Sequence, residues 1–226
     1  MKALKTLNRS GRVLLAGLLV VPLGGCGFYR AGGFRAQDAY RPEEAYLAPD
    51  YAQKTGDRWA LLPVVDLRTD RSEPFDYDKD LRIPVKERFE GGKRLTVTLC
   101  DTFAEGKQPS PLEVKEMEPA ELATLGPKDI PLVLIIFLEY SSSGKGIVST
   151  GPYTFVASTK LIHKPSQTLV WRTKATGADR MAGLPGIRGP DTLGWQKSGA
   201  IRLWMMKAFN VGISRGNSVP ENPEKK

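Results

Sequence analysis

The sequence contains one histidine and two cysteines among 226 residues. Serine–histidine triads, histidine-rich zinc sites and cysteine–histidine nucleophiles all need histidine or cysteine side chains in combination, and one histidine with two cysteines barely provides them. His163 lies in a predicted loop, where we expect a solvated side chain. Carboxylate pairs for glycoside hydrolysis exist among Asp66, Asp70, Glu73 and Asp101, but any chain with 25 acidic residues offers such pairs. We therefore predict a protein that is not an enzyme and that uses no cofactor.

The sequence also lacks an apolar run that would span a bilayer comfortably. The run from Val13 to Leu23 is short and is broken by Gly17 and Pro22. The residues before it are basic, with no acidic residue among them: Lys2, Lys5, Arg9 and Arg12. A basic start, a short apolar core and small residues before a cleavage point are typical of a secretory signal. Residues 1–25 are therefore predicted to be a signal peptide.

The four residues Leu23-Gly24-Gly25-Cys26 close this segment and resemble the lipobox of bacterial lipoproteins. The resemblance implies cleavage before Cys26, a diacylglycerol on its sulfur, and an acyl chain such as palmitate on the new amine. Gly27 is not the aspartate that resembles an inner-membrane retention signal. The expected location is thus the outer membrane, facing the periplasm, with the inner membrane as the alternative. An ordinary signal peptide in which the cysteine falls here by chance is the competing interpretation.

Cys100 has no other cysteine to pair with if Cys26 carries lipid, so no internal disulfide is expected. A lone cysteine in an oxidising compartment usually behaves as a small buried hydrophobe. A reactive thiol is the alternative.

Charge is distributed unevenly along the chain. Four of the 33 basic residues lie in the signal peptide, which leaves 29 basic and 25 acidic residues in the mature chain. Residues 26–139 carry 16 basic and 21 acidic residues, whereas residues 140–226 carry 13 basic and 4 acidic. This asymmetry predicts either a basic face that binds an anionic envelope polymer, lipid or acidic protein, or mutual neutralisation of the two halves. The candidate residues for binding an anionic partner are Arg180, Arg188, Lys197, Arg202 and Lys207.

The chain after the signal peptide divides by composition into three parts. Residues 26–57 contain Gly32-Gly33, Pro42 and Pro49 without a sustained period, which predicts a flexible tether. Residues 58–213 are predicted to form one α/β domain. Residues 214–226 form a polar tail that we expect to be disordered.

Periodicity predicts the elements of the domain. Leu132–Leu138 is apolar without alternation, which favours a central strand covered on both faces. Apolar residues at i, i+3, i+4 and i+7 form a helical stripe: Ile201, Trp204, Met205 and Ala208. Strands are predicted at 59–65, 94–101, 132–138, 153–161 and 168–173, and helices at 85–90, 118–126 and within 191–210. Loops are expected at 105–111, at 141–151, and around Gly177, Gly183, Gly186 and Gly189. This order predicts an α/β sandwich with one mixed sheet of about five strands and helices packed on it.

Three apolar segments within residues 59–175 resemble a group of small envelope proteins. The segments are Leu61–Asp66, Leu132–Leu138 and Leu169–Trp171. The group includes lipoprotein activators of penicillin-binding proteins, the amino-terminal domain of TolB, and curli-secretion-type lipoproteins. The resemblance implies a membrane-anchored, non-catalytic accessory or binding module in a cell-envelope assembly. No nucleic-acid partner is expected, because the net charge of the mature chain is only +4. A role as a subunit of an oligomeric export apparatus is an alternative.

The start of the mature chain, Cys26-Gly27-Phe28-Tyr29, is similar to that of the lipoprotein plug of the lipopolysaccharide translocon. This similarity implies lipopolysaccharide assembly as a further alternative.

Four acidic residues have the spacing of a calcium-binding loop. Asp76, Asp78, Asp80 and Glu87 match its positions 1, 3, 5 and 12. Position 6 demands glycine for a sharp turn, however, and here it is Leu81. The alternative is that these acids flank the start of a helix, where its dipole favours negative charge.

Overall fold

The computed structural model describes residues 41–54, 56–91, 95–104, 108–145, 150–179 and 192–210, all within one compact unit. The strands are β1 (Glu44–Leu47), β2 (Arg58–Leu61), β3 (Val65–Asp66), β4 (Thr96–Leu99), β5 (Leu132–Lys145), β6 (Thr150–His163) and β7 (Thr168–Asp179). The helices are α2 (Tyr51–Lys54), the π-helix η2 (Asp78–Arg82), α3 (Ile83–Glu90), α4 (Pro111–Glu116), α5 (Pro119–Leu122) and α6 (Thr192–Ala208). No helix in these ranges is long and apolar enough to cross a membrane. The predicted signal peptide, Cys26 and the predicted tail lie outside them.

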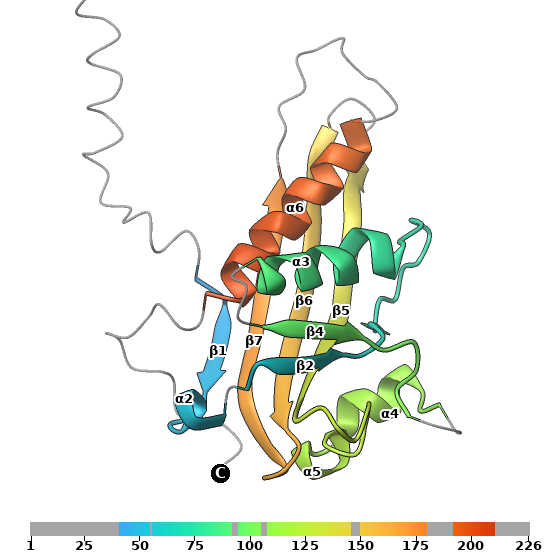
Figure 1. Ribbon diagram of the computed structural model, residues 1–226. Coiled ribbons are helices and arrows are strands. Elements are labelled where there is room, and N and C mark those ends of the chain that lie inside the picture. The colour runs from blue at the N-terminus through green and yellow to red at the C-terminus, as the bar shows by residue number, and fades with distance from the viewer. Residues whose placement is uncertain are drawn as a thin grey trace, which may run out of the picture. The chain divides into compact units, whose positions relative to one another are not determined.

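One mixed sheet organises the domain, which confirms the predicted fold class (Figure 1). Its strand order is β1-β7-β6-β5-β2-β4, and β3 also pairs with β5. β1, β7, β6 and β5 are antiparallel neighbours, whereas β2 runs parallel to both β4 and β5. The sheet has seven strands rather than about five. One extra strand arises because the predicted strand 59–65 divides into β2 and β3 around Pro63, which has no N–H to donate to a ladder.

The other extra strand lies in the stretch predicted to be a tether. β1 pairs along its whole length with β7, with Leu47 opposite Trp171, and the ring of Tyr51 lies 6.0 Å from that of Trp171. The folded domain therefore begins by Glu44 rather than at residue 58. The sequence signal was weak because β1 is short and lies at the edge of the sheet, so only one of its sides is paired.

β5 is the central strand, as predicted. All seven residues of Leu132–Leu138 are buried, and alternate side chains enter two different core clusters on the two faces of the sheet. The chain reverses within 141–151, as predicted, but the turn is shorter than expected, because β5 continues to Lys145 and β6 starts at Thr150. The serines and glycines of this stretch are typical of a turn, but its backbone is extended because it pairs with β6.

Helices cover both faces of the sheet. Val85 of α3 and Ile201 of α6 belong to the core cluster on one face, and Val114 of α4 and Leu122 of α5 belong to the cluster on the other. Figure 1 shows α3 and α6 lying across the same side of the strands. Pro84 lies in the first turn of α3, where its missing N–H is tolerated.

Helix α4 was not predicted, although the sequence carries its start signal. Ser110 accepts a hydrogen bond from the backbone N–H of Glu113, and the Glu113 carboxylate accepts one from the N–H of Ser110. This reciprocal capping box begins a helix at Pro111, where we had expected the end of a loop.

The predicted stripe of α6 is confirmed, since Ile201, Trp204, Met205 and Ala208 are all buried. The interpretation of Gly177 was wrong: it lies inside β7 rather than in a loop. A Cβ built at Gly177 would lie 1.8 Å from the backbone oxygen of Ala200. The glycine therefore permits α6 to approach the sheet closely, and Trp204 then donates a hydrogen bond of 2.9 Å to the carbonyl of Ala157.

Candidate functional site

A groove of about 840 Å³ lies between α3 and α6. We call it the α3–α6 groove. One wall comes from η2, α3 and the residue that follows: Lys79, Asp80, Pro84, Glu87, Arg88 and Gly91. The other wall comes from α6: Gly194, Lys197, Ser198, Ile201, Arg202 and Met205. Both sets recur every three or four residues, so each helix presents one continuous stripe to the groove.

The groove combines apolar and charged groups. Ile201 and Met205 are buried members of the core cluster beneath the two helices, and they give the groove an apolar lining. Charged side chains lie beside them on both walls. Such a combination suits a ligand that carries both apolar and charged groups.

Lys197 is held by contacts within the fold. Its Nζ donates to the carboxylate of Asp80 and to the carbonyl of Pro74, and it lies 4.4 Å from the ring centre of Phe75. The positive charge of Lys197 is therefore largely neutralised by the neighbouring acid. This pair also joins α6 to the π-helix across 117 positions of sequence.

The predicted basic residues do not form one cluster. The structure brings Lys197 and Arg202 together in the groove, and Arg202 is exposed. Lys207 lies outside the groove and pairs with Glu43 at 3.3 Å. Arg180 and Arg188 lie outside the described residues.

Sequence reasoning missed Lys79 and Arg88, which line the groove from the opposite wall. Both are exposed. They stand nine positions apart, which is not the spacing of residues on one face of an α-helix, so the sequence pattern does not connect them. Only the packing of α3 beside α6 shows that these cations border the same groove as Arg202.

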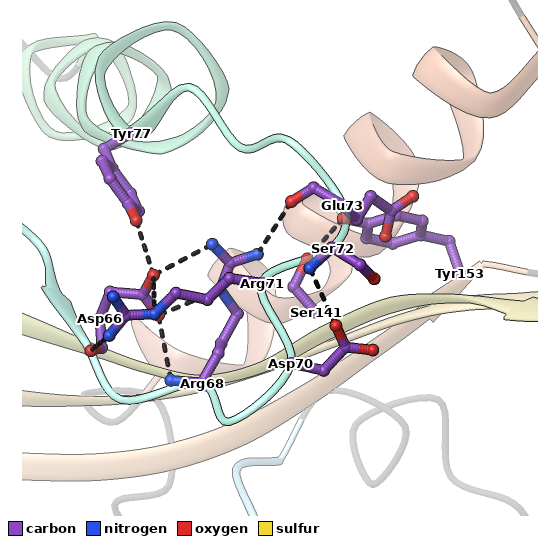
Figure 2. A network of polar contacts seen from close by, with 9 residues as sticks. All are labelled: Asp66, Arg68, Asp70, Arg71, Ser72, Glu73, Tyr77, Ser141 and Tyr153. Atoms are coloured by element: carbon purple, nitrogen blue, oxygen red, sulfur yellow. Dashed lines mark hydrogen bonds and ion pairs between the residues drawn. The ribbon is translucent and has the colours of Figure 1, made fainter.

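A second candidate site is the polar network that follows β3 (Figure 2). The Asp66 carboxylate accepts hydrogen bonds of 3.0 Å from Nε and Nη2 of Arg68 and one of 2.6 Å from the Tyr77 hydroxyl. Arg71 donates to the Asp66 carbonyl at 3.0 Å, and Arg68 donates to the carbonyl of Glu73 at 3.5 Å. Asp66 and Arg68 are both buried.

The network around Asp66 holds the loop after β3 in place and does not make Asp66 a proton donor. Burial by itself would raise the pKa of Asp66, but the hydrogen bonds from Arg68 and Tyr77 outweigh burial and lower it. A general acid needs a raised pKa, so Asp66 is poorly suited to that role. Its contacts hold the loop that carries Phe75 towards η2.

Tyr153 and Ser141 form a separate buried pair in Figure 2. Their hydroxyl oxygens are 2.5 Å apart. Burial raises the pKa of Tyr153 to about 12. This pair is therefore a neutral contact between β5 and β6.

Three of the four acidic residues with calcium-loop spacing, Asp76, Asp78 and Asp80, bond to the backbone or to cations. Asp76 accepts from the backbone N–H groups of Asp78 and Lys79 at 3.1 and 3.0 Å, and Asp80 accepts from the N–H of Asp76 at 2.9 Å. Asp78 pairs with Arg82 at 2.5 Å. These bonds match the interpretation that the acids flank a helix start. Within the described ranges, no three histidine, cysteine or acidic residues are grouped so that they could hold a metal ion.

Cys100 and His163 are the remaining candidates for chemistry. Cys100 is buried, as predicted, and burial raises the pKa of its thiol. His163 ends β6 and is partly buried rather than free in a loop; its Nδ1 lies 2.7 Å from the Ser166 hydroxyl. Burial lowers the pKa of His163. Cys100 follows β4 and His163 ends β6, and neither lines the groove.

No family model matches the chain, and no curated protein matches it. Solved structures are similar at low identity. The PelC dodecamer from Paraburkholderia phytofirmans is 13% identical, with 74% of this chain and 96% of that chain covered and a TM-score of 0.43. A lipoprotein from Neisseria meningitidis is 12% identical, with 65% and 96% covered and a TM-score of 0.42. The LpoB C-terminal domain from Salmonella enterica is 10% identical, with 54% and 83% covered and a TM-score of 0.35. At these values the similarities carry no inference about function.

Proposed function

We propose that the protein is a lipid-anchored, periplasm-facing lipoprotein of the outer membrane that acts as a non-catalytic accessory module in a cell-envelope assembly. The observation that carries this proposal is the sequence Leu23-Gly24-Gly25-Cys26 directly after a basic and then apolar segment. Lipid on Cys26 would hold the folded domain at the membrane surface.

The length of chain between the lipid and the domain limits where that domain can act. Residues 27–40 separate Cys26 from the first described residue. At no more than about 3.6 Å per residue, these residues reach at most about 50 Å. The first described residue of the domain therefore lies within this distance of the membrane that holds Cys26.

The α3–α6 groove supports a binding role for the domain. Arg202 lines it together with cations that the sequence did not single out, and its apolar lining offers contact area. Lys197 and Lys207 already pair with acids, so we expect them to contribute less to capture than Arg202. Arg180 and Arg188 remain candidates for the same anionic partner.

Crosslinked capture from membranes tests the proposal. The native chain is compared with Cys26→Ser, and Cys100→Ser is the matched control that removes a buried thiol without touching the lipid site. We expect a specific partner with the native chain and with Cys100→Ser, and its loss with Cys26→Ser. Recovery of all three forms from the soluble periplasm without a partner would contradict the anchored role.

The captured partner also separates the possible assemblies. A cell-wall synthase would identify an activator. A β-barrel together with saturable lipopolysaccharide binding would identify a lipopolysaccharide-assembly role, and a ring-sized complex would identify an export subunit.

A further inference from the structure

The α3–α6 groove has more unpaired positive than negative charge. The side chains of Lys79, Arg88 and Arg202 have no ion-pair or hydrogen-bond partner among the described residues. Lys197 is neutralised by Asp80, and Glu87 is the remaining acid among the lining residues. An anionic ligand is therefore favoured, and arginine forks bind carboxylates through paired N–H donors.

Two large apolar side chains are exposed beside the groove. Trp195 is 64% exposed, whereas the other tryptophans of the domain are buried to 4% exposure or less. Trp195, Ser198 and Arg202 are spaced i, i+3 and i+7, so the indole lies on the same stripe of α6 as the unpaired arginine. Ile83, which is 41% exposed, precedes Pro84 on the opposite wall.

This combination distinguishes between kinds of anionic ligand. A flat membrane surface would not enter a groove between two helices, and a free phosphate would pair with the cations but would leave Trp195 and Ile83 in water. A protein segment would cover both. Exposed tryptophan next to arginine is also the composition that carries binding energy in protein interfaces.

We propose that the α3–α6 groove, together with Trp195 and Ile83, is the docking site for an acidic segment of a protein partner. Carboxylates of that segment pair with Arg88 and Arg202, and apolar side chains of the segment pack on Trp195 and Ile83. A groove of about 840 Å³ holds a short stretch of chain rather than a whole domain. This inference rests on the proposed accessory function and names the chemistry of the partner.

The test is photo-crosslinking of the full chain in its own host. A benzophenone amino acid is placed at position 195, and in a control chain at Tyr140, which is 48% exposed and outside the groove. Crosslinked peptides are identified by mass spectrometry. The same chain is then tested with Arg88→Glu and Arg202→Glu, and with the matched reversals Lys115→Glu and Lys128→Glu, whose exposed side chains lie outside the groove.

We expect position 195, but not position 140, to capture one segment that is rich in aspartate and glutamate. The arginine reversals should reduce its yield about tenfold or more, and the lysine reversals should leave it unchanged. Reversing the partner's acids to lysine should restore capture by the arginine-reversed chain. Equal melting temperatures of the variants show that the loss is not unfolding.

Other results would overturn the inference. These are a crosslink to lipid, a captured segment without acidic residues, no specific product at position 195, or an unchanged yield after the arginine reversals. The Cys26→Ser chain, mixed in solution with the captured partner, separates the two proposals. If it still crosslinks through position 195, docking holds even where the anchor proposal fails.

Discussion

The contact between Gly177 and α6 gives the sharpest prediction about stability. In Gly177→Ala the new Cβ would lie 1.8 Å from the backbone oxygen of Ala200 and 2.8 Å from the backbone nitrogen of Trp204. Both obstacles are backbone atoms, so no side-chain rotation relieves them. The helix must retreat by at least about 1.6 Å to reach an ordinary contact distance, and a gap of that size removes much of the van der Waals attraction beneath Ala200 and Trp204.

Overpacking of this kind typically costs about 1–3 kcal/mol and occasionally more. We expect Gly177→Ala to reach about 3 kcal/mol, because the hydrogen bond from Trp204 to Ala157 is lost as the helix moves. For a domain of this size, each kcal/mol lowers Tm by about 2–4 °C, which predicts a fall of about 6–12 °C. Thermal unfolding followed by circular dichroism, together with urea titration, measures the change.

Gly194→Ala is the matched control. Gly194 is in the same helix, and a Cβ there meets nothing within 4 Å. Alanine favours helix over glycine by up to about 1 kcal/mol, so this variant should melt at the native temperature or slightly above it. An unchanged Tm for Gly177→Ala, or an equal fall for Gly194→Ala, would refute the account of how α6 packs.

Three further predictions concern buried polar groups and the free thiol. Asp66→Asn leaves Arg68 buried without its counter-charge and should cost about 3–5 kcal/mol in urea unfolding. The fold lowers the pKa of Asp66, so the Asp66 carboxylate stabilises the fold fully at a pH above its unfolded pKa of about 4, and this stabilisation is lost as the pH falls below that value. If the native chain and Asp66→Asn lose stability in acid to the same extent, this prediction is wrong. Tyr153→Phe should cost about 1–2 kcal/mol, since Ser141 loses its partner, and should remove the tyrosine that titrates at about pH 12 in an absorbance titration. Cys100 should react with a disulfide reagent far more slowly in the folded chain than in denaturant, because burial raises its pKa, and equal rates in the two states would exclude that burial.

The parts of the fold that were predictable are those with a local signal. Leu132–Leu138 identified the central strand because burial on both faces removes polar residues from it. The stripe from Ile201 to Ala208 identified α6 because one helical face enters the core. Both signals lie within a few residues of sequence.

The parts that were missed depend on distant packing. β1 is a strand because β7 pairs with it, and Gly177 is required because α6 crosses at Ala200. Neither cause is visible near the residue itself.

The candidate site was predictable only in part for the same reason. Arg202 was singled out because it lies in the basic C-terminal part, but the other two unpaired cations of the groove, Lys79 and Arg88, come from a segment more than a hundred residues earlier. Lys197 was expected to be available to a partner, whereas Asp80 already pairs with it. Charge counted along the sequence does not show which charges the fold neutralises.

The mass of the N-terminal peptide of the native protein, purified from membranes, tests the central proposal most directly. We predict that the mature chain begins at Cys26 and that this peptide carries a diacylglycerol and an amide-linked acyl chain, both absent from Cys26→Ser. A mature chain that begins at another residue, or an unmodified Cys26, would contradict the account of a lipid-anchored envelope module.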